Sequence, residues 1–204
     1  TRFGQTLPNT SPDLSIGGPQ LQNRAIPGFE PEKIPDGVPS MKFTPPAVTG
    51  LGFLAALTDQ QILQYVDSLD VDGDGISGVP NYITPPAYFE QKSIHQPVNG
   101  KIIGRFGKKA AAIDLLQQTV SAYNQDMGVT STFEPIDPFS QLSTDPEVSD
   151  QTIRDVVFYL RTLKAPISRS EENSQVLHGK ATFTEIGCVS CHIPEWTTPE
   201  TDIK

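Results

Sequence analysis

A Cys-x-x-Cys-His motif contains the residues best suited to chemistry in this sequence, Cys188, Cys191 and His192. Two thiols at this spacing on one tight turn can form thioethers with the two vinyl groups of a single porphyrin, and the histidine can then ligate the iron on its proximal side. The motif therefore predicts covalent attachment of haem c. Phe183 lies in the short helix expected just before the motif, and we expect its ring to pack against the haem.

Two other chemistries use the same pair of cysteines. A Cys-x-x-Cys sequence can also be a thiol redox pair or half of a zinc site. The chain contains only two cysteines, so a four-ligand zinc site would need His95 or His178 as a further ligand. The histidine that directly follows the second cysteine, and the Gly-Lys-x-x-Phe sequence at 179–183, favour haem.

An acidic loop is the second candidate site. Aspartates at alternate positions followed by glycine are typical of the first half of a calcium loop of the EF-hand type, and three adjacent carboxylates repel each other unless a cation is present. The expected calcium ligands are Asp70, Asp72, Asp74, the carbonyl of Ile76, and Asn81. Asn81 stands where an EF-hand has its bidentate glutamate, which indicates a weaker site or one completed from elsewhere in the chain. The alternative is an Asp/Gly-rich turn without metal.

Charge and hydropathy limit the classes of partner. The net charge of −9 argues against nucleic acid, whose phosphates would be repelled, whereas a redox partner protein remains compatible with it. No apolar run approaches about 20 residues, so we expect no membrane-spanning segment. Covalent attachment of haem takes place outside the cytoplasm, so the motif predicts a periplasmic or otherwise extracytoplasmic protein.

The predicted fold is mainly α, with a modest helical core and long ordered loops. Hydrophobic residues make up 36% of the chain, while 19 prolines and 16 glycines interrupt regular structure, above all before Thr49. Apolar stripes at helical spacing predict principal helices over 59–69, 110–127 and 149–164.

Capping signals mark the ends of these predicted helices. Thr58 and Gln61 form a capping box at the start of the first, and Gly128 should end the second. Asp145 or Ser149 is expected to cap the third.

Two domains are predicted on either side of a proline-containing linker. Residues 1–165 are expected to form a helical, loop-rich domain with the possible calcium loop. Residues 166–204 are expected to begin a second, cytochrome-c-like domain that carries the haem motif, because fewer than about 40 residues cannot normally fold alone.

Several motifs occur in a fixed order along the chain. They are Asp-Gly-Asp-Gly-Ile-Ser-Gly at 72–78, Gly-Arg-Phe-Gly at 104–107, Asp-Met-Gly-Val-Thr-Ser at 126–131, Val-Val-Phe-Tyr-Leu-Arg-Thr-Leu at 156–163, and the haem motif. From about residue 18 to 194 the sequence resembles the bacterial di-haem oxidoreductase family, also described as peroxidases or thiol oxidoreductases. That family is similar in haem arrangement to the di-haem cytochrome c peroxidases. The resemblance implies two cytochrome-c-like haem domains in a mostly helical, exported protein.

Three departures from the family pattern stand out. The family has two Cys-x-x-Cys-His motifs, and only the second is present here, so the first would lie before Thr1. Family members also continue past the second motif, where the distal ligand of that haem is expected. The family commonly has Trp after Arg-Phe-Gly, and this sequence has Lys108, which puts an aromatic electron relay between haems in doubt.

The resemblance implies a peroxidase-like redox enzyme with electron transfer between haems. Cleavage of an O–O bond needs an acid/base group and a cation near an open iron site, for which Arg105 and Glu134 are the candidates. Met127 could ligate iron through its thioether, although a buried methionine more often fills a core. The alternatives are an electron-transfer cytochrome without substrate chemistry, favoured by six-coordinate iron, and an interaction segment without haem.

Overall fold

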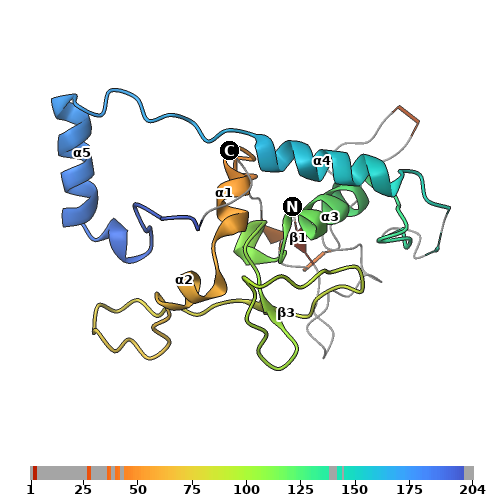
Figure 1. Cartoon of the computed structure of the whole chain (residues 1–204), viewed down its shortest axis with the longest axis horizontal. Coiled ribbons are helices and arrows are strands. Elements are labelled where there is room, and N and C mark those ends of the chain that lie inside the picture. Colours follow the sequence, from red (N-terminus) through yellow and green to blue (C-terminus); the bar gives the residue numbers. More distant parts are fainter. Residues whose placement is uncertain are drawn as a thin grey trace.

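The computed structural model describes residues 2–3, 27–28, 36–37, 40–41, 44–137, 142–143 and 145–199, and these are mostly helical where they are regular (Figure 1). The helices are α1 (Leu51–Ala56), α2 (Asp59–Leu63), α3 (Leu115–Met127), α4 (Asp150–Thr162) and α5 (Ser174–Glu185), with 3-10 turns η2 (Lys108–Ala110) and η3 (Cys188–Ser190). Four short strands, β1 (Arg2–Phe3), β2 (Ser40–Met41), β3 (Tyr82–Ile83) and β4 (Ile102–Ile103), form two antiparallel pairs, β1 with β2 and β3 with β4. The mainly α prediction is confirmed. The proline-rich stretch before Thr49 lies mostly outside the described residues.

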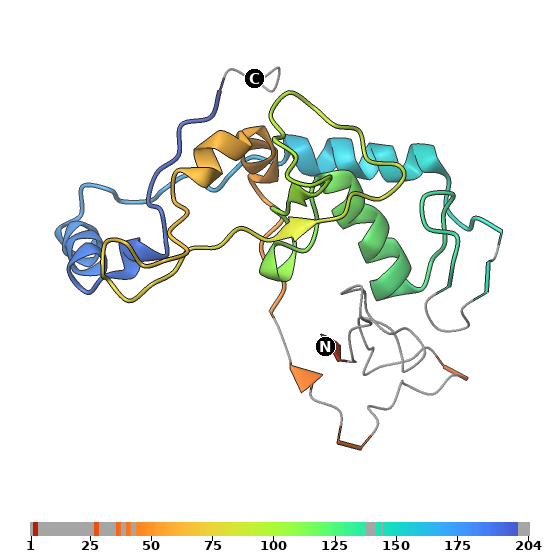
Figure 2. The same cartoon turned by 90° about the horizontal axis from the view of Figure 1, so that it is seen from below.

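The core lies where α3 and α1 pack against α4, in the middle of the molecule (Figure 2). Ile113 and Ile153 are fully buried there, and Val120 of α3 is 1% exposed. Phe106 and Leu115 form a buried cluster beside them. Burying side chains of this size contributes about 1.5–3 kcal/mol each, so this small cluster holds the three helices together. Within the described residues no helix is both long enough and apolar enough to cross a membrane.

The predicted capping signals are found in the structure. The side chain of Thr58 accepts a hydrogen bond from the Gln61 amide, and the Gln61 side chain accepts one from the Thr58 amide, which completes the capping box of α2. Gly128 ends α3 in the left-handed conformation, with φ of 68°. Of the two residues proposed for α4, Ser149 is the cap, because its hydroxyl accepts from the Thr152 amide.

The extents of the first two predicted helices are wrong. The first ends at Leu63 instead of residue 69, because the chain then enters the acidic loop, which Asp67 and Gly78 close by two backbone hydrogen bonds of 3.0 Å. The second begins at Leu115 instead of residue 110. Ala112 pairs with Phe106 across a β-bridge, and this pairing keeps the preceding backbone from becoming helical.

Helix α5 lies apart from the helical core. Figures 1 and 2 both show it beyond α1, joined to α4 by an extended connection. None of its residues is buried, and the segment after it returns to the neighbourhood of α2. There the Trp196 ring contacts Tyr65 edge-on with centroids 5.1 Å apart, and the Thr197 carbonyl accepts a hydrogen bond of 2.7 Å from Gln61. The division into two domains remains a prediction.

Candidate functional site

The predicted haem-attachment residues lie on one short turn that follows α5. Gly187 introduces the turn with φ of 83°, a left-handed conformation that costs glycine little. The backbone amides of Cys191 and His192 both donate to the Cys188 carbonyl, at 3.3 and 2.9 Å. Both thiols are free, Cys188 half-buried and Cys191 exposed. The turn therefore presents two unpaired thiols and an accessible imidazole from five consecutive residues.

Exposed apolar side chains lie in α5 and next to this turn. The Phe183 ring lies 6.1 Å from the His192 ring, centroid to centroid, and is 39% exposed. Ile186 next to the turn is 69% exposed, and Leu177 in α5 is 54% exposed. A large, flat, apolar group placed on the turn would remove such surface from water, which is favourable.

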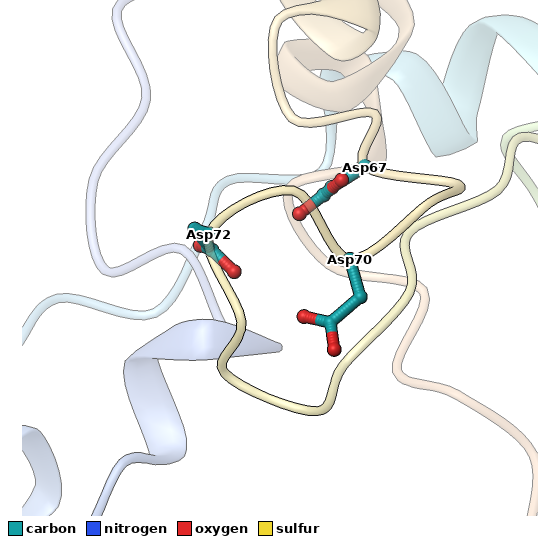
Figure 3. Close-up of side chains that lie close together, drawn as sticks. All are labelled: Asp67, Asp70 and Asp72. Atoms are coloured by element: carbon teal, nitrogen blue, oxygen red, sulfur yellow. The ribbon is translucent and has the colours of Figure 1, made fainter.

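The acidic loop lies beside this turn in both overall views (Figures 1 and 2). Carboxylate oxygens of Asp67, Asp70 and Asp72 lie within 4.8 Å of one another and converge on the interior of the loop (Figure 3). Asp70 has φ of 51°, a left-handed conformation that aspartate adopts more readily than most residues. The loop backbone is thus folded so that three acidic side chains share one space.

The remaining predicted calcium ligands do not belong to this group of three carboxylates. The Asp74 carboxylate accepts a hydrogen bond of 2.8 Å from the Ile76 amide. The Asn81 side chain donates to the carbonyls of Lys109 and Ala110, at 3.1 Å each, which ties the loop's exit to the η2 turn. The residue that sequence reasoning missed is Asp67, because the EF-hand alignment was started at Asp70. The signal that could have found it is the Asp-x-x-Asp spacing at 67–70.

Arg105 is the centre of a buried ion pair. Its Nη2 lies 2.5 Å from Oδ1 of Asp59, and its Nη1 donates to the Leu57 carbonyl. The two side chains are 4% and 0% exposed, and the second carboxylate oxygen of Asp59 accepts from the Gln96 amide at 2.6 Å. Both terminal nitrogens of Arg105 are therefore engaged within the fold, whereas its buried Nε has no hydrogen-bond partner among the described residues.

A cavity of about 260 Å³ lies beside Arg105, between α1, α4, the start of α3 and the loop that precedes β4. Its charged and polar wall consists of Glu90, Lys92, His95, Arg105, Asp114, Arg154 and Arg161. Its apolar wall includes Phe106, Leu115 and Val157. His95 is buried, and its Nδ1 accepts from the Lys92 amide at 3.0 Å. Burial and the neighbouring Arg105 lower the pKa of His95, so that its imidazole is neutral at pH 7.

The other predicted acid/base residue, Glu134, is not among the residues described as lining this cavity. Its carboxylate accepts a hydrogen bond of 3.1 Å from the Tyr88 hydroxyl. Burial raises the pKa of Glu134, and burial together with the adjacent carboxylate raises that of Tyr88. The pair is a half-buried polar contact between two loop segments.

Met127, the predicted iron ligand, is the last residue of α3 and is 56% exposed. Helix α3 lies well apart from α5 and its turn in both overall views (Figures 1 and 2). The structure therefore does not bring Met127 together with His192. A buried core role for Met127 is also excluded by its exposure.

Comparison with known protein families assigns the chain to one of them. Residues 41–204 match a family model described as "Di-haem oxidoreductase, putative peroxidase". A search of curated proteins and a search of solved structures gave no match. The matched range contains the Cys188–His192 turn, whose free thiols, exposed imidazole and uncovered apolar side chains fit the haem that this description implies. Because the match spans most of the sequence, the chain belongs to the di-haem oxidoreductase family.

Proposed function

We propose that this protein is a c-type haem oxidoreductase of the peroxidase type. The observation that supports this most directly is the turn that follows α5, with two free thiols and one accessible imidazole inside the range that matches the family. Cys188 and Cys191 would hold the porphyrin by thioethers, and His192 would be the proximal iron ligand. When bound, the haem would supply an iron centre able to exchange electrons and to reduce peroxide.

The chain's own residues set the surroundings of that group. Phe183 and Ile186 would exclude water from the porphyrin face nearest the turn, and a less polar environment favours the iron state of lower charge. The contact of Trp196 with Tyr65 and that of Thr197 with Gln61 of α2 connect the haem segment to the rest of the chain. These two contacts would limit how far the turn moves as electrons arrive and leave.

Three further properties follow from this proposal. Electrons would pass between two haems, as expected for a di-haem family. A redox partner protein would donate or accept them at the surface. Since thioethers to haem form outside the cytoplasm, the protein would work in the periplasm or another extracytoplasmic space.

The test is an optical spectrum of protein produced with haem-maturation machinery, recorded oxidised, reduced and with peroxide. We expect a Soret band that persists after denaturation, and a spectral shift with peroxide. Replacing both Cys188 and Cys191 with Ala should abolish covalent haem. Covalent haem in that double variant would contradict the attachment site, and a spectrum that does not respond to peroxide would favour an electron-transfer cytochrome.

His192→Ala tests the proximal ligand, and the chain offers a matched control. His178 lies in α5, is exposed, and stands outside the motif, so His178→Ala should leave the spectrum unchanged. His192→Ala should retain covalent haem but shift the iron to a high-spin spectrum that added imidazole reverses. Identical spectra for the two variants would exclude His192 as the ligand.

We also propose that the acidic loop binds Ca²⁺. Three carboxylates whose oxygens lie within 4.8 Å of one another suit a hard cation that prefers oxygen ligands at about 2.3–2.6 Å. Because the loop lies beside the haem turn, a bound ion would fix the frame of the haem site and would take no part in redox chemistry. Calcium should raise the melting temperature and a chelator should lower it. Equal melting curves with calcium and with chelator would show that the loop is an Asp/Gly-rich turn without metal.

A further inference from the structure

The cavity beside Arg105 combines a cationic wall with an apolar one. Three arginines and Lys92 line it, against the two acidic lining residues and Asp59, which pairs with Arg105, in a protein whose net charge is −9. The apolar wall comes from all three helices that meet there: Ala55 of α1, Leu115 of α3 and Val157 of α4. A clustered positive wall in an acidic protein is a local feature that the overall charge does not explain.

Arg105 adds an independent observation. Its side chain is 96% buried, since 4% of it is exposed, and it lines the cavity. Its Nε is the only buried side-chain nitrogen or oxygen among the described residues that has no hydrogen-bond partner. An unpaired donor on a buried charged group is unfavourable, so the guanidinium at this wall of the cavity is incompletely hydrogen-bonded within the fold.

We propose that this cavity binds a small organic monocarboxylate, with its carboxylate on the arginine wall next to Arg105 and its apolar body against α1, α3 and α4. A carboxylate matches the planar guanidinium and can accept two parallel hydrogen bonds from it. The apolar wall favours an organic ligand over a hydrated inorganic anion. Glu90 and Asp114 in the wall disfavour a doubly charged ligand such as sulfate.

The titration behaviour of the wall is consistent with this charge distribution. Burial, followed by the nearby Arg161, lowers the pKa of Lys92. The cations on the wall therefore repel one another in the empty cavity, and a bound carboxylate would relieve that repulsion. This proposal does not depend on the haem motif, and its test can succeed or fail independently of the proposed haem chemistry.

Isothermal titration calorimetry of the chain with benzoate, benzyl alcohol and sulfate tests the proposal. Benzoate supplies a carboxylate on an apolar ring, benzyl alcohol keeps the ring without the charge, and sulfate keeps charge without an apolar body. We expect benzoate to bind and the other two to bind at least tenfold more weakly. No benzoate binding, or equal binding of benzoate and benzyl alcohol, would overturn the proposal.

Substitutions locate the site. Arg105→Lys keeps the charge that faces Asp59 but removes Nε, and should weaken benzoate binding roughly tenfold or more, the effect of one charged hydrogen bond. Arg161→Gln is the second cavity variant, for use if Arg105→Lys fails to fold, and it should weaken benzoate binding several-fold. The control is Arg169→Gln, an exposed arginine in the connection between α4 and α5, which should change nothing. Unchanged affinity in both folded cavity variants would refute the assignment.

A haem carries carboxylates of its own on its propionate arms, so the same chemistry has two possible sources. Repeating the benzoate titration with haem-loaded protein distinguishes them. Unchanged benzoate affinity after loading assigns the cavity to a free carboxylate. The cavity is assigned to a propionate if two results occur together: haem loading abolishes benzoate binding, and Arg161→Gln alters the haem spectrum.

Discussion

Arg105 and Asp59 form an ion pair that water does not reach, with an Nη2–Oδ1 distance of 2.5 Å. The pair joins the first turn of α2 to the segment that follows β4, 46 residues further along the chain. Asp59 also binds the loop that precedes β4. Its amide donates to the Ile94 carbonyl at 2.9 Å, and its carboxylate accepts from the Gln96 amide. One carboxylate thereby holds three segments together at the edge of the cavity.

Asp59→Asn should be strongly destabilising, because it leaves the Arg105 guanidinium buried without its counter-charge. We expect a loss of about 3–5 kcal/mol in the free energy of unfolding, measured by urea denaturation. The double variant Asp59→Leu with Arg105→Met should lose less than Asp59→Asn alone, because no buried charge remains. An Asp59→Asn protein with an unchanged urea midpoint would show that the pair contributes nothing to stability.

Gly104→Ala should be destabilising because there is no space for a methyl group at this position. An added Cβ would lie 1.9 Å from the Ala110 carbonyl oxygen and 2.5 Å from Cδ1 of Ile83. The expected cost is about 1–3 kcal/mol, typical of overpacking. Gly179 in α5 is the matched control, since nothing lies within 4 Å of its added Cβ and alanine favours helix by about 0.5–1 kcal/mol. Equal melting temperatures for the two variants would contradict the close approach.

Local signals predicted the parts of the fold that depend on neighbouring residues. The capping box at Thr58, the end of α3 at Gly128 and the Cys-x-x-Cys-His turn are each contained within a few residues. The start of α3 was misplaced because Ala112 is held by its bridge to Phe106, a tertiary contact. The cap that begins α3 is Asp114, whose side chain accepts from the Gln117 amide, and this local signal went unrecognised.

The Arg105–Asp59 pair and the cavity had no local signal at all. Their residues come from α1, α2, α3, α4 and two loops, and only packing brings them together. The sequence indicates Arg105 as a candidate cation near an iron site, but its partner Asp59 could not be found from spacing. The Tyr88–Glu134 contact, between residues 46 positions apart, could not be predicted for the same reason.

Glu134→Gln should make the stability of the protein less dependent on pH. Burial raises the pKa of Glu134 above that of the unfolded chain, so the folded state binds this proton more tightly. The resulting stability is present below the unfolded pKa and is lost as pH rises through the raised folded pKa. Melting temperatures of wild type and variant should therefore diverge between pH 4 and pH 7, with the variant more stable at pH 7.

Glutamine keeps an acceptor for the Tyr88 hydroxyl, so the Glu134→Gln comparison isolates the charge. Glu185→Gln, at the exposed end of α5, is the control and should follow wild type across the same range. A Glu134→Gln protein that melts at a lower temperature than wild type at pH 7 would show that the ionised carboxylate stabilises the fold.

Substitutions in the acidic loop can distinguish the calcium ligands predicted from the sequence from those that the structure brings together. The sequence pattern places Asp70, Asp72 and Asp74 around calcium, whereas the structure brings Asp67 together with the first two and leaves Asp74 bonded to the Ile76 amide. Asp67→Asn should therefore weaken Ca²⁺ binding as much as Asp70→Asn does. Asp74→Asn should have a smaller effect, because Asp74 does not belong to the group of three carboxylates whose oxygens converge.

The measurement is the rise in melting temperature with added Ca²⁺, compared across the three variants. Removing a carboxylate also reduces repulsion in the metal-free loop. Asp67→Asn and Asp70→Asn should therefore melt at a slightly higher temperature than wild type in chelator, and calcium should raise their melting temperatures less. A reversed order, with Asp74→Asn abolishing the calcium effect and Asp67→Asn leaving it intact, would favour the EF-hand alignment over the observed cluster. The ligand set would then have to form by a rearrangement of the loop on binding the ion.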